Sequence, residues 1–171
     1  QARVMGGGSS INAMIAIRGL PDDYDSWARQ GAHGWAWPDV LPYFRKLEHD
    51  TEFDGPLHGR DGPVPIRRIP QSSWPPFSRA VVESMQTRGL AFGPDMSGVH
   101  DDGVFLMPQN NTPESRVSMA MAYLNAEVRA RPNLTIIGRR LVWCILVNAG
   151  RVVGVRTHGN NGTQDFHGRE I

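Results

Sequence analysis

The sequence lacks several features that would each point to a particular class of protein. It contains one cysteine, so no internal disulfide can form and a disulfide-stapled secreted domain is excluded. No apolar stretch is long enough to span a bilayer. The formal net charge is only +1, which argues against nucleic acid or an anionic membrane surface as the main partner, because both favour a concentrated basic patch.

What is present is typical of a globular protein with a core. Apolar residues make up 40% of the 171 residues and charged residues 20%. The one cysteine, Cys144, lies in the apolar run 141–147, where we expect a buried and inert thiol. The nearest approach to a basic patch is the pairs Arg67-Arg68 and Arg139-Arg140, which we expect on the solvated surface.

Periodicity and turn residues predict an α+β fold class, with several helices followed by a small antiparallel β-meander. We expect helices over residues 22–30, 38–47, 77–88 and, capped by Ser115 or Ser118, up to residue 131. We expect strands over residues 64–69, 103–109, 134–137, 141–147, 152–157 and 163–171. The run 10–17 is a short buried helix or strand, because so few residues do not separate the two periods. Turns are predicted at residues 148–151 and 160–162.

The most informative segment is the glycine turn Gly6-Gly7-Gly8-Ser9-Ser10, which stands directly before an apolar run. Glycines let the backbone approach a ligand closely, and serines can cap a helix whose first amides then face an anion. Two interpretations stay open. One is a nucleotide or flavin contact made by backbone amides and a serine hydroxyl, and the other is a tight structural turn before a packed helix. The spacing matches neither a Walker loop nor the Gly-x-Gly-x-x-Gly fingerprint.

A second segment imitates the start of a calcium loop, with oxygen ligands at alternate positions before a glycine. Its residues are Asp50, Glu52, Asp54, Gly55 and Asp61. However, Pro56 follows the glycine, the closing residue is Asp rather than Glu, and no second flanking helix is predicted. We therefore expect an exposed acidic turn here.

The six histidines are His33, His49, His58, His100, His158 and His167. None forms a metal pair at helical spacing, and none stands beside the cysteine. His100 with Asp101 and Asp102 could act as a general base with carboxylate neighbours, although a solvent-facing turn is the favoured interpretation. No Gly-x-Ser-x-Gly nucleophile elbow occurs. The residues alone therefore predict no complete catalytic constellation and no metal site.

Several motifs follow one another along nearly the whole chain: residues 2–25, with Ala2-Arg-Val-Met-Gly-Gly-Gly-Ser-Ser-Ile-Asn12 and Arg18-Gly19, then 34–35, 40–46, 58–63 (His-Gly-Arg-Asp-Gly-Pro), 118–124, 131–135 and 150–155. Taken together, they resemble the glucose–methanol–choline (GMC) oxidoreductases, especially the choline-dehydrogenase-like branch. Met5 and Gly8 depart from the usual residues of the first family signature, at positions whose contacts are largely backbone. The resemblance implies an FAD-dependent enzyme that oxidises a small-molecule alcohol to a carbonyl by hydride transfer to the flavin.

The resemblance also implies a set of cofactor-binding residues: Val4, Gly7, Gly8, Ser9, Asn12, Ala13, Met14, Ile15 and Val142. It places the turn at residues 7–9 near the flavin and pyrophosphate, and residues 12–15 beside the isoalloxazine edge. Val4 would lie along the cofactor, and Val142 would meet the adenine side through its backbone. Ile11 stands where some choline-oxidising members carry a histidine that binds FAD covalently, so no covalent link is expected there.

Three parts of the family pattern are missing from these residues: the dinucleotide fingerprint, the second signature, and the catalytic histidine with its His or Asn partner. No residue here inherits the catalytic role. We expect an incomplete part of a two-domain FAD-binding and substrate fold, cut from a longer chain whose remainder is its partner. Residues 1–50 would hold the flavin-contacting turn and helices, 51–132 part of the substrate domain, and 133–171 a meander of the FAD domain. A lyase of the hydroxynitrile-lyase type with a redox-idle flavin, or a non-enzymatic binding module, are the alternatives.

Overall fold

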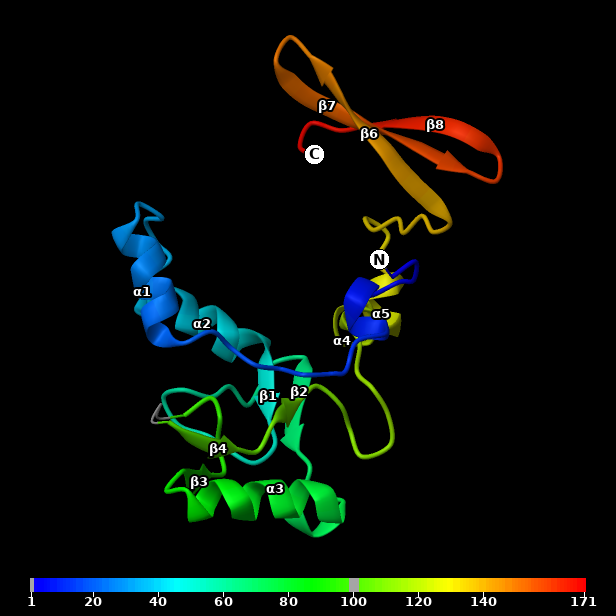
Figure 1. Ribbon diagram of the computed structural model, residues 1–171. Helices are drawn as coiled ribbons and strands as arrows, with labels where there is room; N and C mark the ends of the chain where they lie inside the picture. Colours follow the sequence, from blue (N-terminus) through cyan, green and yellow to red (C-terminus); the bar gives the residue numbers. More distant parts are fainter. Residues whose placement is uncertain (1, 99–101) are drawn as a thin grey trace. The chain divides into compact units, whose positions relative to one another are not determined.

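The computed structural model describes residues 2–98 and 102–171, which form two compact units, Gln1–Asn125 and Ala126–Ile171 (Figure 1). The first unit holds η1 (Gly7–Ser10), α1 (Pro21–Arg29), α2 (Trp37–Leu47), β1 (Glu48–Asp50), β2 (Val64–Arg68), η2 (Gln71–Ser73), α3 (Pro76–Thr87), β3 (Ala91–Gly93), β4 (Gly103–Phe105), β5 (Pro108–Gln109) and α4 (Met119–Tyr123). The second holds α5 (Ala126–Arg129), β6 (Arg140–Asn148), β7 (Arg151–Gly159) and β8 (Gly162–His167). Among the described residues, no helix combines the length and apolar character needed to cross a membrane.

Helices α1 and α2 begin and pack as their sequences predict. Pro21 occupies the first turn of α1, and the Asp23 carboxylate accepts the amide of Leu20 at 2.8 Å. The ring of Tyr24 on α1 lies 5.6 Å from that of Trp37 and 5.7 Å from that of Phe44 on α2. These rings join the two helices through aromatic contacts.

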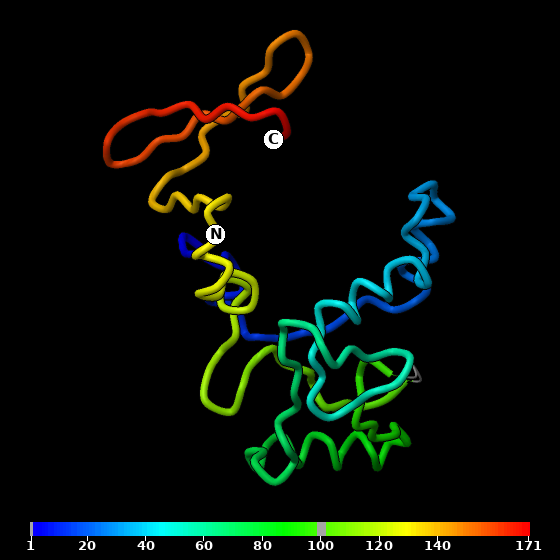
Figure 2. The backbone as a smooth tube through the Cα atoms, turned by 180° about the vertical axis from the view of Figure 1, so that it is seen from behind, coloured from blue at the N-terminus to red at the C-terminus, as the bar shows by residue number. Residues whose placement is uncertain are grey.

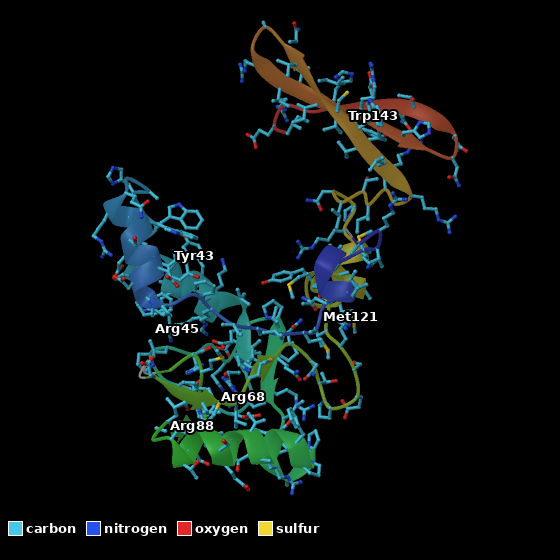
Figure 3. All side chains as sticks on the ribbon, viewed as in Figure 1. Tyr43, Arg45, Arg68, Arg88, Met121 and Trp143 are labelled. Atoms are coloured by element: carbon cyan, nitrogen blue, oxygen red, sulfur yellow. The ribbon has the colours of Figure 1, made fainter. Side chains whose placement is uncertain are left out.

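The apolar stripe predicted for α2 is partly buried in the structure. Val40, Leu41, Phe44 and Leu47 are half-buried, whereas Tyr43, at the edge of this stripe, is 71% exposed (Figure 3). The spacing of the four residues at i, i+1, i+4 and i+7 explains this division, because such positions share one side of a helix.

A three-stranded sheet, in the order β1-β2-β5, lies at the centre of the first unit. Strand β1 runs parallel to β2, with Glu48 opposite Val64, and β5 runs antiparallel on the other side. Along β2, Val64, Ile66 and Arg68 are buried and alternate with half-buried residues. This alternation follows from the two-residue period of a strand, and it puts an arginine on the same buried face as two apolar side chains.

The first unit also contains helices α3 and α4 and the strand pair β3–β4. Helix α3 ends at Thr87, and Gly89 follows it with a φ of +92°, as the glycine stop predicts. Strands β3 and β4 form a separate parallel pair. Helix α4 is capped by Ser118, whose hydroxyl accepts the amide of Met121 at 3.3 Å. The predicted cap at Ser118 is thus confirmed.

The second unit contains the predicted meander, β6-β7-β8, with each neighbouring pair antiparallel. Ala149 and Gly150 form the first turn with φ of +48° and +76°, the positive values that a two-residue hairpin turn of the primed type requires. Strand β6 is exposed along most of its length, and Trp143, labelled in Figure 3, is 73% exposed. Cys144 is exposed as well, so the prediction of a buried thiol is wrong.

The structure differs from the expected elements in four further places. Residues 10–17 are neither a regular helix nor a strand; η1 ends at Ser10 and an irregular segment follows it. The expected strand 103–109 divides into β4 and β5, because its two ends pair with different partners. The expected strand 134–137 is irregular, and the helix predicted up to residue 131 breaks into α4 and α5 at residues 124–125. The α+β class itself is confirmed.

Candidate functional site

Residues 4–16, called the glycine segment below, begin with a tight turn that is closed by hydrogen bonds between its own residues. Gly7 N donates to Val4 O at 3.0 Å, and Ser10 Oγ donates to Met5 O at 2.7 Å. Gly6 has a φ of +89°, a left-handed conformation that a residue with a Cβ rarely adopts. The turn is therefore closed from within, and glycine is needed for its backbone path.

The hydroxyl of Ser9 has two partners within the protein. It donates to Gly6 O at 2.5 Å and accepts from Met119 N, the first amide of α4, at 2.9 Å. Segment η1 and helix α4 accordingly lie side by side in both ribbon and tube (Figures 1 and 2). A serine expected to cap a helix beginning in its own segment thus satisfies a helix amide 110 residues away.

A second segment, residues 108–117, holds the glycine segment in place. Asn110 N donates to Met14 O at 2.8 Å, and Ala16 N donates to Pro108 O at 2.9 Å. Asn110 is itself buried, and its Nδ2 donates to Val117 O at 2.8 Å. The two segments are far apart in sequence, so this contact depends on the tertiary fold.

The side chain of Asn12 lies at the centre of this contact. Its Oδ1 accepts from Arg116 Nη1 at 3.0 Å and from Met14 N at 3.0 Å. The same Arg116 nitrogen also donates to Ser9 O at 3.1 Å. Met14 has a φ of +63°, which is disfavoured for a residue with a side chain. Residues 9–14 are therefore held in one defined conformation.

The surface of the glycine segment is compatible with a flat, partly apolar ligand. A Cβ added at Gly7 or Gly8 would meet nothing within 4 Å, so the backbone is open to approach there. Val4, Ile11 and Ile15 are exposed apolar side chains along the same segment. The described residues thus fit one wall of a flavin site, and their contact with FAD stays a prediction.

Two other predicted contact residues lie in less structured surroundings. Ala13 is exposed in the irregular segment after η1. Val142 lies in the second unit on β6, opposite Thr157, and the register of the β6–β7 pair shifts between Val142 and Cys144. Such an irregularity bends a strand and disturbs its regular pairing. The predicted backbone contact of Val142 with the adenine side is not tested by this geometry.

A buried network of charged side chains lies beside the sheet of the first unit. Its members are Arg18, Glu48, Asp50, His58, Arg68 and Asp95. Arg68 Nη1 donates to both oxygens of Asp50, at 2.6 and 2.5 Å, and Nη2 lies 3.2 Å from Asp95 Oδ1. Figure 3 shows Arg68 within the lower part of the first unit. The expectation that Arg68 is solvated is therefore wrong.

His58 faces three carboxylates in this network. Its Nε2 lies 2.8 Å from Asp95 Oδ2, whereas Nδ1 lies 3.3 Å from Asp50 Oδ2 and 3.7 Å from Glu48 Oε1. Within the described part of the chain, Nδ1 has no partner in hydrogen-bond geometry. Glu48, Asp50 and His58 are close enough to hold a metal ion together.

The charge balance argues for a structural network rather than a metal site. Two arginines already pair with its three carboxylates: Arg18 with Glu48, and Arg68 with Asp50 and Asp95. A divalent cation beside a neutral His58 would leave a net positive charge in a buried place, which is costly. The pKa of Asp50 is lowered: burial raises it, but hydrogen bonds from Arg68 and from the amides of Phe53 and Glu52 outweigh burial.

The other candidate residues have ordinary surroundings or lie outside the described part. Asp50 is fully buried and paired with arginine, so the expected exposed acidic turn is wrong at that residue. His100 and Asp101 lie outside the described residues, and Asp102 is exposed. Sequence reasoning missed His58 as a buried group, although the resemblance of residues 58–63 to a family motif pointed to this region.

Comparisons with known proteins identify relatives that match nearly the whole of this chain. The chain is 40% identical to the 5-(hydroxymethyl)furfural oxidase of Methylovorus sp. (strain MP688) over 172 residues, which cover all of this chain and 32% of that protein. It is 38% identical to the oxygen-dependent choline dehydrogenase of Sinorhizobium fredii over 155 residues, 91% of this chain and 28% of that protein. The chain thus spans about a third of the length of these relatives.

Solved structures give the same result. The crystal structure of pyridoxine 4-oxidase from Mesorbium loti matches 96% of this chain with a TM-score of 0.87 and 31% identity, and the match covers 32% of that protein. An FAD-dependent oxidoreductase from Chaetomium thermophilum matches 98% of this chain with a TM-score of 0.86 and 32% identity, covering 31% of that protein. Because the family GMC oxidoreductase also matches residues 1–170, the chain belongs to the GMC oxidoreductases.

Proposed function

We propose that the protein containing this sequence is an FAD-dependent oxidoreductase that oxidises an alcohol to a carbonyl compound. The observation that carries this proposal is the glycine segment, whose open backbone at Gly7 and Gly8 is held in one conformation beside exposed apolar side chains. The named relatives support the reaction class, since hydroxymethylfurfural and choline are both alcohols.

In this proposal, residues of the chain form one wall of the cofactor site. The turn at Gly7, Gly8 and Ser9 approaches the flavin and pyrophosphate through its backbone, while Val4 lies along the cofactor. Residues 12–15 line the isoalloxazine edge, and Val142 meets the adenine side. When bound, FAD supplies the acceptor for a hydride from the alcohol carbon. The proton of the alcohol goes to a histidine base that lies in the rest of the parent protein.

The 171-residue chain alone is expected neither to oxidise an alcohol nor to bind FAD tightly. It lacks the Gly-x-Gly-x-x-Gly strand–turn–helix, whose helix N-terminus binds the pyrophosphate in dinucleotide sites. The proposed contact residues would cover only one side of FAD, so we expect the 171-residue chain to bind FAD weakly.

The test compares the full-length protein with the 171-residue chain. The full-length protein should purify with a flavin absorption spectrum, and alcohols should bleach it under anaerobic conditions. A colourless full-length protein, or a flavin that no alcohol reduces, would contradict the proposed reaction. A yellow 171-residue chain with alcohol-dependent dye reduction would contradict the proposed need for the rest of the protein.

A further inference from the structure

We propose that Arg116 is a positioning residue for the flavin-facing wall, acting through Asn12 and Met14. This inference rests on the proposed function and adds a role to a residue outside the predicted cofactor contacts. Arg116 lies just before α4, and it reaches Ser9 and Asn12 more than one hundred positions away in sequence.

The first step is the orientation of the Asn12 amide. Both groups that face Oδ1, the guanidinium of Arg116 and the backbone amide of Met14, are donors. Reversing the amide would turn its NH2 group toward two donors, so the network permits one orientation. Nδ2 is thereby fixed as the outward group, and a hydrogen-bond donor is presented on the exposed side of Asn12. An electron-rich edge with carbonyl oxygens and ring nitrogens, as in an isoalloxazine, matches that donor.

The second step is the backbone of Met14. Its left-handed conformation persists because the Asn12 side chain accepts its amide and Asn110 donates to its carbonyl oxygen at 2.8 Å. The side chain is also contacted, since Asn111 Nδ2 lies 3.8 Å from Met14 Sδ. Disfavoured backbone held from several sides is typical of functional sites. Loss of the Arg116 hydrogen bond releases Asn12, and with it the conformation of Met14.

The third step is electrostatic. The guanidinium of Arg116 is always positively charged, and it is hydrogen-bonded to Asn12, which belongs to the proposed cofactor surface. Negative charge that builds on a reduced flavin is stabilised by a fixed cation nearby, because the cation needs no reorganisation. Removing the cation is therefore expected to lower the midpoint potential of the bound flavin as well as to weaken its binding.

The experiment uses the full-length flavoenzyme with three substitutions. R116M should weaken FAD binding by about 10-fold to 100-fold, the loss expected for a hydrogen bond to a charged group, and should lower the flavin midpoint potential. R116K should recover most of both, because one Arg116 nitrogen makes both bonds and a single Nζ can replace it. R29M is the matched control, since it removes an arginine of an exposed ion pair with Asp22, and it should behave as the wild type.

A structural role alone would lower only the melting temperature of R116M, and unchanged FAD affinity, flavin spectrum and potential would overturn the inference. If R116M does not fold, R116Q replaces it as the test variant, because it removes the charge of Arg116 while keeping a donor that can face Asn12 Oδ1. The R116Q protein should show the lowered potential with a smaller loss of FAD affinity, and a wild-type potential there would overturn the inference. A full-length wild type without FAD would instead overturn the proposed function, and this inference with it.

Discussion

Replacing Arg68 with methionine should destabilise the protein far more than replacing an exposed arginine. The Asp50 carboxylate is fully buried and receives two hydrogen bonds from Arg68 Nη1. Methionine fills much of the space of the arginine side chain but leaves Asp50 without its cation. Breaking a buried pair in this way costs about 3–5 kcal/mol of the free energy of unfolding.

Urea unfolding followed by circular dichroism measures this free energy, and thermal melting gives the corresponding shift in melting temperature. For a chain of this size, each kcal/mol corresponds to about 2–4 °C in melting temperature, so R68M should melt roughly 6–20 °C lower. The control R29M removes a cation whose side chain is 62% exposed, and it should cost less than about 1 kcal/mol.

The double variant D50N/R68M separates loss of the cation from loss of packing. It replaces the stranded carboxylate with a neutral amide, so it should be more stable than R68M alone. Equal stability of R68M and R29M, or a double variant no better than R68M, would refute the claim that a buried charge dominates.

Three further predictions follow from other local features. Because the folded-state pKa of Asp50 lies below its ordinary 3.8, its contribution to stability is present above that value and is lost as pH falls through the folded pKa. Melting curves recorded at decreasing pH should therefore show the difference between wild type and D50N shrinking in the acid range. G59A should cost about 1–3 kcal/mol in urea unfolding, because its Cβ would overlap the backbone of Arg45, whereas G138A has open space and serves as control. Cys144 should react with a thiol reagent in the folded 171-residue chain, and reaction only after denaturation would contradict its exposure.

The sequence predicts helices and hairpins well where local chemistry determines them. The stripe of α2 follows from helical spacing, and the turn at Ala149 and Gly150 follows from residues that accept positive φ. These features depend on neighbours within a few positions. No distant partner is needed to specify them.

The strands that sequence reasoning missed depend on distant partners. Strands β1 and β3 have three residues each, and they are strands only because β2 and β4 pair with them. Such short segments carry too few residues to show a period.

Burial of Arg68 could have been predicted from the sequence. Val64 and Ile66 set the inward face of β2, so the two-residue period places Arg68 inward and Arg67 outward. The identity of its partners could not be predicted, because Asp50 and Asp95 come from a separate strand and a separate loop. The pairing of Arg116 with Asn12 could not be predicted for the same reason, because the two residues are 104 positions apart and meet only in the tertiary fold.

The buried charged network is connected to the proposed flavin-facing wall through one of its members, Arg18. Arg18 ends the segment that begins with the glycine turn, and its guanidinium pairs with Glu48 and donates to Leu57 O at 2.5 Å. The stretch is thus fixed at its far end by buried ion pairs and along its middle by Arg116 and Asn110. A wall anchored at both places has its conformation set by the protein before any ligand arrives. If the proposed wall binds FAD, such preorganisation lowers the entropic cost of binding, because the backbone need not be ordered by the ligand.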